Sequence, residues 1–372
     1  MPEFDNNLHL CLVGPIPPPA GGMANQTRQL KQLLEQDGVK VTMVAVNAPY
    51  RPAIIGKIPG LRAVFRLIPY LVSLYRSIGK AQVVHVMANS GWSWHLFAAP
   101  AIAIAKLRKT PVIINYRGGH AETFFAKSWR SVHFTLRHAS AVLVPSTFLQ
   151  DVFARYQQSS AIVPNILNHK VFYPATTPRA MSDKSIAAPH CIVTRNLEGI
   201  YDIASAINAF HLLWQQLPQA KLTIAGTGPL LAQLQQQVEK LRLTDAVTFA
   251  GRLSAEQMAQ LYRSADIMLN SSLVDNSPNS VIEAMACAVP VVSTSVGGIP
   301  KLVTHGKDAL LTPAGDVRQM CDYMLQILEQ PQLRQQLVDN ALQNSQRFHW
   351  QAVRQQLLQH YREAIHQTEP AQ

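Results

Sequence analysis

Short apolar runs alternate along this chain with longer segments in which apolar residues recur every three or four positions. In the first half, six runs rich in Val, Ile and Leu predict buried strands. They are Leu8–Val13, Val39–Val46, Gln82–Val86, Pro111–Asn115, Ala141–Val144 and Ala161–Val163. Periodic segments lie between them; in the first, Met23, Thr27, Leu30 and Leu34 fall on one helical face. Strands alternating with helices predict a parallel α/β domain.

The second half repeats the alternation. Apolar runs predict strands at His190–Thr194, Ala220–Ala225, Val247–Ala250 and Asp266–Leu269, and a further short apolar run covers Val289–Val292. Periodic segments predict helices at Ile203–Leu213, at Leu230–Leu241 and from Ser254 onward. We therefore expect an α/β protein with two doubly wound, Rossmann-like parallel-sheet domains.

A stretch without periodicity separates the halves. Lys170–Ala188 contains Pro174, Pro178 and two adjacent threonines, a composition typical of a linker. We place the domain boundaries accordingly, with an N-terminal domain at 1–172, a linker at 173–188, a C-terminal domain at 189–348 and a C-terminal helix and tail at 349–372. The tail segment Trp350–His366 is amphipathic, and we expect it to cross back to the N-terminal domain.

One stretch, Asp275–Pro300, concentrates candidate chemistry. A polar turn, Asn276–Asn279, follows a predicted strand, and a helix-forming segment, Ser280–Ala288, follows the turn. The first N–H groups of a helix are unpaired and its dipole favours anions there. Asp275 and Glu283 flank this point, so the phosphates of a nucleotide sugar would meet the N–H groups and its hydroxyls the carboxylates. The alternative is a surface loop before a buried helix.

Two polar segments in the first half also follow predicted strands. Gly21 and Gly22 precede the first helix and permit close backbone approach to a phosphate, although they lack the GxGxxG spacing. A plain loop is the alternative. Arg117 and His120 flank a Gly-Gly pair after the strand Pro111–Asn115. Because open parallel sheets bind ligands at the carboxyl ends of their strands, this cluster is a candidate site.

Charge is unevenly distributed. The chain has 372 residues, 48% hydrophobic and 15% charged, which indicates a globular protein with large cores, and its formal net charge is +11. Between Asp37 and Glu122 there is no acidic residue, against 11 Lys and Arg. Such a field indicates an anionic partner: nucleic acid, an anionic membrane surface or a phosphorylated substrate. The aromatic and basic interleaving of nucleic-acid binders is missing, so we expect no nucleic acid.

The segment 51–80 is the candidate membrane contact. Within Leu61–Lys80, an apolar face is accompanied by Arg62, Arg66, Arg76 and Lys80 with no acid, the pattern of a helix lying on an anionic membrane surface. The alternative is an amphipathic core helix with a solvated polar face.

Cysteine usage and apolar stretches bear on location. The four cysteines are scattered without a CxxC pair, which predicts buried reduced thiols in a cytosolic protein and no metal site. No N-terminal segment has signal-peptide anatomy, and the longest apolar stretch, Gly91–Ala105, is too short to span a membrane. We expect a cytoplasmic protein, and a peripheral association with the inner membrane face is compatible with this expectation.

These motifs resemble the family-4 glycosyltransferases of the GT-B fold. The resemblance rests on Asp275-x-x-Pro278-Asn279-Ser280-Val281-x-Glu283, on Pro290-Val291-Val292 and on Gly297-Gly298-Ile299-Pro300, with weaker support from Ala225–Pro229 and Val163–Asn165. It implies a retaining, metal-independent transferase that moves a sugar from a nucleotide-diphosphate sugar to a saccharide or lipid-linked acceptor in surface or exopolysaccharide biosynthesis. The acceptor, for example a polyprenyl-diphosphate-linked saccharide, would bind the N-terminal domain. The absence of Asp-x-Asp agrees with metal independence.

The resemblance also implies residue roles. Asp275 would face the donor sugar, Glu283 the ribose hydroxyls, and Arg195 the diphosphate. The family commonly has a Lys six residues after this Arg; here that position is Tyr201, so the leaving group needs charge from elsewhere. Arg117 falls where many members carry a His. The expected catalytic residues are Arg195, Asp275, His120 and Arg117, and the donor-binding residues are Gly21, Gly22, Arg195, Glu198, Gly226, Asp275, Pro278, Asn279, Ser280 and Glu283.

Two other functions remain open at this point. A sugar-nucleotide epimerase of the same fold would need no acceptor. A non-catalytic nucleotide-sugar-binding partner of an assembly complex would tolerate the missing Lys at Tyr201.

Overall fold

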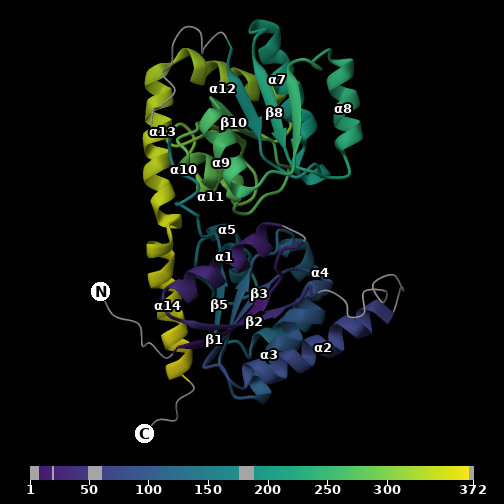
Figure 1. The fold of residues 1–372 in the computed structure, drawn as a ribbon, viewed down its shortest axis with the longest axis vertical. Helices are drawn as coiled ribbons and strands as arrows, with labels where there is room; N and C mark the ends of the chain where they lie inside the picture. Colours follow the sequence, from purple (N-terminus) through teal and green to yellow (C-terminus); the bar gives the residue numbers. More distant parts are fainter. Residues whose placement is uncertain (1–7, 19–20, 49–60, 176–187, 368–372) are drawn as a thin grey trace. The chain divides into compact units, whose positions relative to one another are not determined.

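The computed structural model describes residues 8–18, 21–48, 61–175 and 188–367 (Figure 1). The chain forms two compact units, of which unit 1 comprises residues 1–166 together with 350–372 and unit 2 comprises residues 167–349. Most of the predicted linker, 173–188, and the first part of the candidate membrane segment, 51–80, lie outside the described residues. Every helix in the described ranges is too short or too polar to traverse a lipid bilayer.

Unit 1 is built on a parallel six-stranded sheet in the order β2-β1-β3-β4-β5-β6. Its strands are β1 (His9–Gly14), β2 (Lys40–Ala45), β3 (Val83–Ala88), β4 (Val112–Tyr116), β5 (Ala141–Val144) and β6 (Ala161–Ile162). The strand order reverses at β1, which lies between β2 and β3. β3 and β4 are buried throughout because β-branched and apolar side chains cover both faces of a sheet enclosed by helices.

Helices cover both faces of this sheet (Figure 1). The helices of unit 1 are α1 (Gly22–Gln36), α2 (Leu61–Ile78), the π-helical turn η2 (Trp94–Ala98), α3 (Ala99–Leu107), α4 (Ala121–Leu136), α5 (Thr147–Ala154) and α14 (Trp350–His366). One core joins α2, η2, α3, α4 and α5 to the sheet, and a second joins α1 and α14 to the opposite face. The unit therefore has the three-layer organisation of a doubly wound domain.

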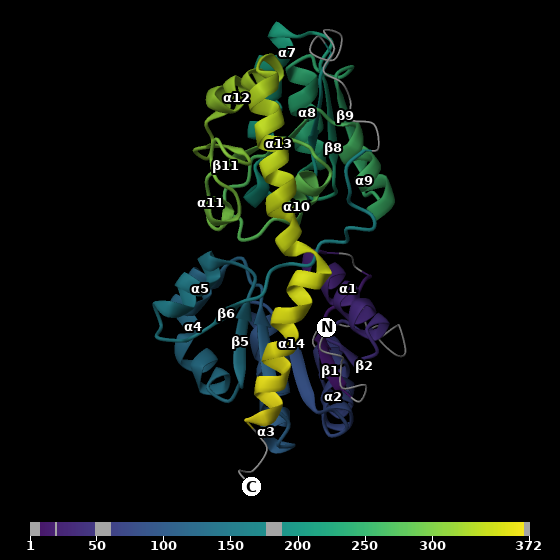
Figure 2. The same cartoon turned by 90° about the vertical axis from the view of Figure 1, so that its left-hand side faces the viewer.

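The C-terminal helix belongs to unit 1, as Figure 2 shows. The Trp350 indole N–H donates to the Asp37 carboxylate at 2.9 Å, and the Arg354 guanidinium pairs with the same carboxylate at 2.7 Å. Further along α14, the buried Tyr361 hydroxyl lies 2.8 Å from His85 Nδ1 on β3. The prediction that the tail crosses back to the N-terminal domain is confirmed.

Unit 2 repeats the architecture with the strand order β12-β11-β10-β7-β8-β9, again all parallel. Its strands are β7 (His190–Val193), β8 (Lys221–Ala225), β9 (Val247–Gly251), β10 (Ile267–Asn270), β11 (Val291–Thr294) and β12 (Leu310–Thr312). Its helices are η3 (Gly199–Tyr201), α7 (Ile203–Gln216), α8 (Leu231–Lys240), α9 (Ala255–Ser264), α10 (Asn279–Ala286), α11 (Ile299–Leu302), α12 (Val317–Glu329), α13 (Pro331–Ser345) and η4 (Gln346–Phe348).

Two cores enclose the second sheet, one on each face. The predicted fold class, two doubly wound α/β domains, is confirmed. The four cysteines are buried and free, as the sequence predicts. Ser254 forms a capping box with Gln257 at the start of α9, and Ser146 caps α5.

Candidate active site

The turn between β10 and α10 is held by a glycine pair. The N–H of Gly298 donates to the Asp275 carbonyl at 2.9 Å. A Cβ added at Gly297 would lie 2.0 Å from that carbonyl oxygen, and one at Gly298 would lie 1.8 Å from the Asn276 oxygen. Gly297 also has a φ of +53°, which disfavours other residues. The Gly-Gly motif is thus required for the turn that precedes α10.

α10 begins at Asn279, with Pro278 as its N-cap. Proline has no side-chain acceptor, so Pro278 itself makes no capping hydrogen bond to this end. The helix end therefore keeps its dipole directed at the turn, an arrangement suited to a phosphate.

Arg195, which follows β7, contacts two other predicted site residues, Asp275 and Ser280. Its guanidinium forms an ion pair with Asp275 and donates to Ser280 Oγ at 3.3 Å. The side chains of Arg195 and Asp275 are only 12% and 10% exposed, so solvent screens this pair weakly. The guanidinium also lies 4.1 Å from the ring centroid of Tyr201, a cation–π contact. Tyr201 therefore fixes Arg195 instead of supplying a second cation.

The Asp275 carboxylate is strongly engaged. Besides Arg195 it accepts from its neighbour, the N–H of Asn276, at 2.9 Å and from Ser272 Oγ at 3.3 Å. Burial raises its pKa, while Arg195 and these hydrogen bonds act in the opposite direction. In this state Asp275 orients the guanidinium beside the start of α10.

Glu283 is held on α10 by a tyrosine that the sequence did not single out. Tyr262 on α9 donates to Glu283 Oε2 at 3.2 Å, and its hydroxyl also lies 2.8 Å from Thr194 Oγ1 and 3.1 Å from the Ser280 carbonyl oxygen. Burial raises the pKa of Glu283 to about 7, against the opposing effects of the Tyr262 bond and the Arg195 charge. A carboxyl group whose pKa is close to neutral pH therefore lies near the start of α10.

The loop after β8 packs against the Arg195 segment. A Cβ at Gly226 would lie 2.0 Å from the Arg195 carbonyl oxygen, and one at Gly228 would lie 2.3 Å from the Leu197 oxygen. Gly226 thus supports the backbone of Arg195. Glu198 accepts from Asn196 Nδ2 at 3.1 Å within the same segment.

Unit 1 holds the remaining predicted residues. Arg117 follows β4, where its Nε donates to Asn115 Oδ1 at 3.1 Å and its Nη1 to Asn165 Oδ1. Among the described residues it forms no ion pair with a carboxylate. Burial lowers its pKa to about 10, so it remains a cation at neutral pH. On β3, burial and then the Arg117 charge lower the pKa of His85 to about 3.

His120 and the first glycine loop are placed differently. His120 is exposed just before α4, and within the described ranges its ring makes no hydrogen bond, so the structure does not join it to Arg117. Gly21 is the N-cap of α1 and Gly22 its first residue. A Cβ at Gly21 would meet no atom within 4 Å, so packing alone does not require glycine there. The roles of these three residues remain predictions.

The described residues contain no cluster of three or more His, Cys, Asp or Glu side chains arranged to hold a metal ion. The polar groups gathered after β7 and β10 are instead those that bind phosphates and hydroxyls: a guanidinium, a helix N-terminus and two carboxylates.

Two family models match the chain. One, described as Glycosyltransferase Family 4, matches residues 20–170, and the other, described as Glycosyl transferases group 1, matches residues 191–344. The two doubly wound units together define a protein of the GT-B fold. The chain belongs to the group 1, family 4 glycosyltransferases.

Curated relatives share part of the chain. The N-acetyl-alpha-D-glucosaminyl L-malate synthase of Bacillus anthracis is 28% identical over 181 residues, which are 48% of this chain and 47% of that protein. A sulfoquinovosyl transferase of Arabidopsis thaliana is 24% identical over 270 residues, 68% of this chain and 52% of that protein. The chain thus spans about half the length of these relatives.

Solved structures match nearly the whole chain. HepE of Anabaena, in complex with UDP-glucose, has a TM-score of 0.72 at 20% identity, covering 94% of this chain and 98% of that one. A sucrose-phosphate synthase from Thermosynechococcus elongatus has a TM-score of 0.74 at 22% identity, covering 97% and 100%. At these identities the likeness establishes the fold.

Proposed function

We propose that this protein is a retaining, metal-independent glycosyltransferase that uses a nucleotide-diphosphate sugar. The observation that carries the proposal is the fixed Arg195 guanidinium, which Asp275 and Tyr201 hold beside the start of α10. A diphosphate placed there would meet a cation and a helix dipole from the same side. The Anabaena structure with UDP-glucose supports a UDP-sugar as the first donor to test.

In this proposal the protein acts mainly through electrostatic stabilisation of the leaving diphosphate. As the bond between the anomeric carbon and the phosphate oxygen breaks, negative charge develops on that oxygen, and Arg195 and the N–H groups of Asn279 and Ser280 stabilise it. The acceptor oxygen attacks on the same face, and its proton passes to the departing phosphate. Asp275 contacts the sugar through the side of its carboxylate that Arg195 leaves open, and Glu283 accepts from the ribose hydroxyls.

The proposed acceptor is a saccharide or polyprenyl-diphosphate-linked saccharide in the synthesis of a surface polysaccharide or exopolysaccharide. Two features support an anionic acceptor: the acid-free stretch between Asp37 and Glu122, and the Arg117 guanidinium at the carboxyl end of β4.

Thermal unfolding in the presence of UDP-, GDP- and ADP-sugars tests the donor site. A ligand that binds only the native state at about 100 times its Kd stabilises it by about 2.7 kcal/mol, so one nucleotide class should raise Tm clearly. Product analysis with the stabilising donor, with and without acceptor, follows. If the donor is epimerised in the absence of acceptor, the protein is an epimerase and not a transferase. If no nucleotide sugar raises Tm, the proposed donor site is wrong.

The raised pKa of Glu283 predicts a pH-dependent donor KM. Ribose hydroxyls donate to the ionised carboxylate, so donor binding weakens as Glu283 is protonated, and KM should fall as pH rises through about 7. In the free protein the linkage has the opposite sign. Because burial raises the pKa of folded Glu283 from its usual value of 4.5 to about 7, the stability contribution of this group is present at low pH and is lost as pH rises from about 4.5 to about 7.

Initial rates measured from about pH 5.5 to about pH 8.5, a range centred on this pKa, give the donor KM as a function of pH. Tyr262→Phe provides the matched control, because Tyr262 lowers the Glu283 pKa through its hydrogen bond and its loss should move the KM transition to higher pH. A KM profile identical in wild type and Glu283→Gln would show that Glu283 does not bind the donor.

Tyr201 should matter through its ring rather than its hydroxyl. Tyr201→Ala removes the face on which Arg195 stacks and should lower transfer about tenfold, the size of a partly desolvated cation–π contact. Tyr201→Phe keeps the ring and should retain nearly full turnover. Equal kcat/KM values for the two variants would show that the Tyr201 ring does not position Arg195.

A further inference from the structure

Helix α2 carries two apolar stripes, only one of which is used by the core. Tyr70, Leu74 and Ile78 are buried against the sheet. On the other side, four large apolar side chains face solvent at intervals that place them on one helical face: Phe65, Ile68, Val72 and Tyr75 are 48%, 57%, 44% and 47% exposed. Neither sequence-based alternative for this helix anticipated that it would be apolar on both sides.

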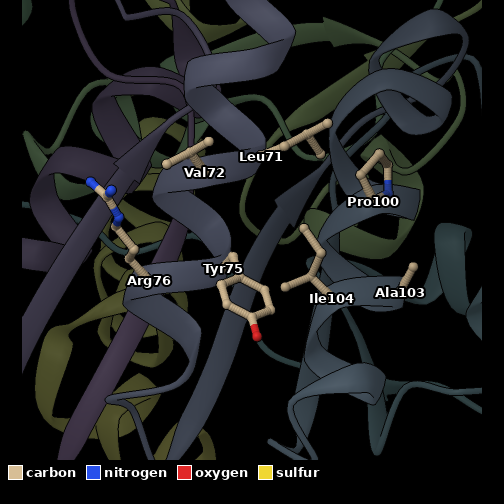
Figure 3. Close-up of a pocket in the computed structure, with 7 residues that line it drawn as sticks. All are labelled: Leu71, Val72, Tyr75, Arg76, Pro100, Ala103 and Ile104. Atoms are coloured by element: carbon tan, nitrogen blue, oxygen red, sulfur yellow. The ribbon is translucent and has the colours of Figure 1, made fainter.

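The exposed stripe continues into an open groove between α2 and α3 (Figure 3). The groove has a volume of about 530 Å³ and is lined on the α2 side by Leu71, Val72, Tyr75 and Arg76, and on the α3 side by Pro100, Ala103 and Ile104. In Figure 3 the Tyr75 ring lies opposite Ile104, while the Arg76 guanidinium extends away from the groove. At the end of α3, Leu107 is 71% exposed. Contiguous exposed apolar surface of this kind marks an interaction site.

The charges around the stripe are of one sign. Arg76, Lys80, Arg108 and Lys109 are exposed around α2 and α3, and the Arg108 guanidinium lies 4.6 Å from the centroid of the Tyr75 ring. No acidic residue occurs in the sequence between Asp37 and Glu122. In a two-fold dimer through this face, bases would face bases, which disfavours self-association. A partner that complements this face has an apolar interior and a negatively charged surface.

We infer that α2 and α3 form a docking surface for a bilayer containing anionic phospholipids. The apolar stripe and the groove enter the boundary between headgroups and acyl chains, with Phe65 and Tyr75 at the depth that aromatic side chains prefer. Arg76, Lys80 and Arg108 contact lipid phosphates. Docking does not depend on glycosyl transfer, and it would bring unit 1 to a lipid-linked acceptor if the proposed function holds.

Vesicle co-sedimentation of the full chain tests the docking surface without using turnover. We expect binding to phosphatidylcholine vesicles containing about 30% phosphatidylglycerol and little binding to phosphatidylcholine alone. Raising NaCl from about 0.1 M to 0.5 M should weaken the binding severalfold, because it screens exposed charges. Arg76→Glu should reduce the partition coefficient at least about fivefold, the effect of a single base near an anionic surface.

Val72→Glu tests the apolar stripe. It should reduce partitioning about tenfold or more while leaving the thermal unfolding midpoint nearly unchanged, because Val72 is already 44% exposed. Leu231→Glu is the matched control, since Leu231 is a 37% exposed apolar residue on α8 of unit 2. It should bind vesicles like the wild type. Equal losses in the two variants, or equal binding to neutral vesicles, would overturn the inference, as would a dimer in light scattering that Val72→Glu dissociates.

Discussion

Replacing Arg195 with alanine is expected to lower the rate of sugar transfer by about 10²- to 10³-fold, the usual effect of removing one fixed group that stabilises developing negative charge. Arg195 is the cation at the start of α10, and Tyr201 does not supply another. The loss should appear mainly in kcat at saturating donor, because charge on the leaving diphosphate grows toward the transition state.

The same substitution leaves the Asp275 carboxylate buried without its ion pair. The free energy of unfolding should therefore fall by about 1–3 kcal/mol at neutral pH, the cost of an unsatisfied buried group. Adding Asp275→Asn removes that uncompensated charge and should restore most of the stability but none of the activity. If the double variant recovered transfer, Arg195 would serve only to neutralise Asp275. Urea unfolding and initial rates on the same samples separate these outcomes.

The arrangement of the sheets could be predicted from the sequence because burial on both faces leaves a strong local pattern. The run Ala141–Val144 coincides with β5, and the other predicted runs overlap their strands with small shifts at the ends. β12, Leu310–Thr312, was not predicted, since three residues are too few to show a period. The π-helical turn η2 was also missed, because its hydrogen-bond register has no signature in apolar spacing.

The candidate site was predictable only in part. Asp275 and Glu283 lie within one motif, whereas Arg195 is brought to Asp275 across 80 positions of the chain, which only the family resemblance indicated. Tyr262 was missed because a tyrosine on the apolar face of a helix is indistinguishable from a core residue. Its hydroxyl contacts, which join Thr194 and Glu283, depend on how α9 packs beside α10 and leave no local pattern.

Arg117 presents a different balance between stability and function. Its guanidinium is bound by two neutral amide oxygens, of Asn115 and Asn165, and by no carboxylate among the described residues. Placing a cation in such surroundings costs free energy unless an anion arrives. Replacing it with methionine removes that cost but also removes the Arg117 hydrogen bonds to the Asn115 and Asn165 amide oxygens, so the opposing terms should change the free energy of unfolding by less than about 1 kcal/mol.

Transfer, in contrast, should fall about 100-fold in Arg117→Met if this guanidinium holds a substrate phosphate, and Arg117→Lys should rescue it only partly because an ammonium lacks the planar fork. Inorganic pyrophosphate should raise the Tm of the wild type more than that of Arg117→Met, a readout that a structural role would not move. His120→Ala is the companion variant: its exposed ring makes no hydrogen bond in the described residues, so any loss of rate reports on chemistry rather than folding. If Arg117→Lys kept full activity while His120→Ala lost most of it, His120 and not Arg117 would be the functional polar residue at the end of β4.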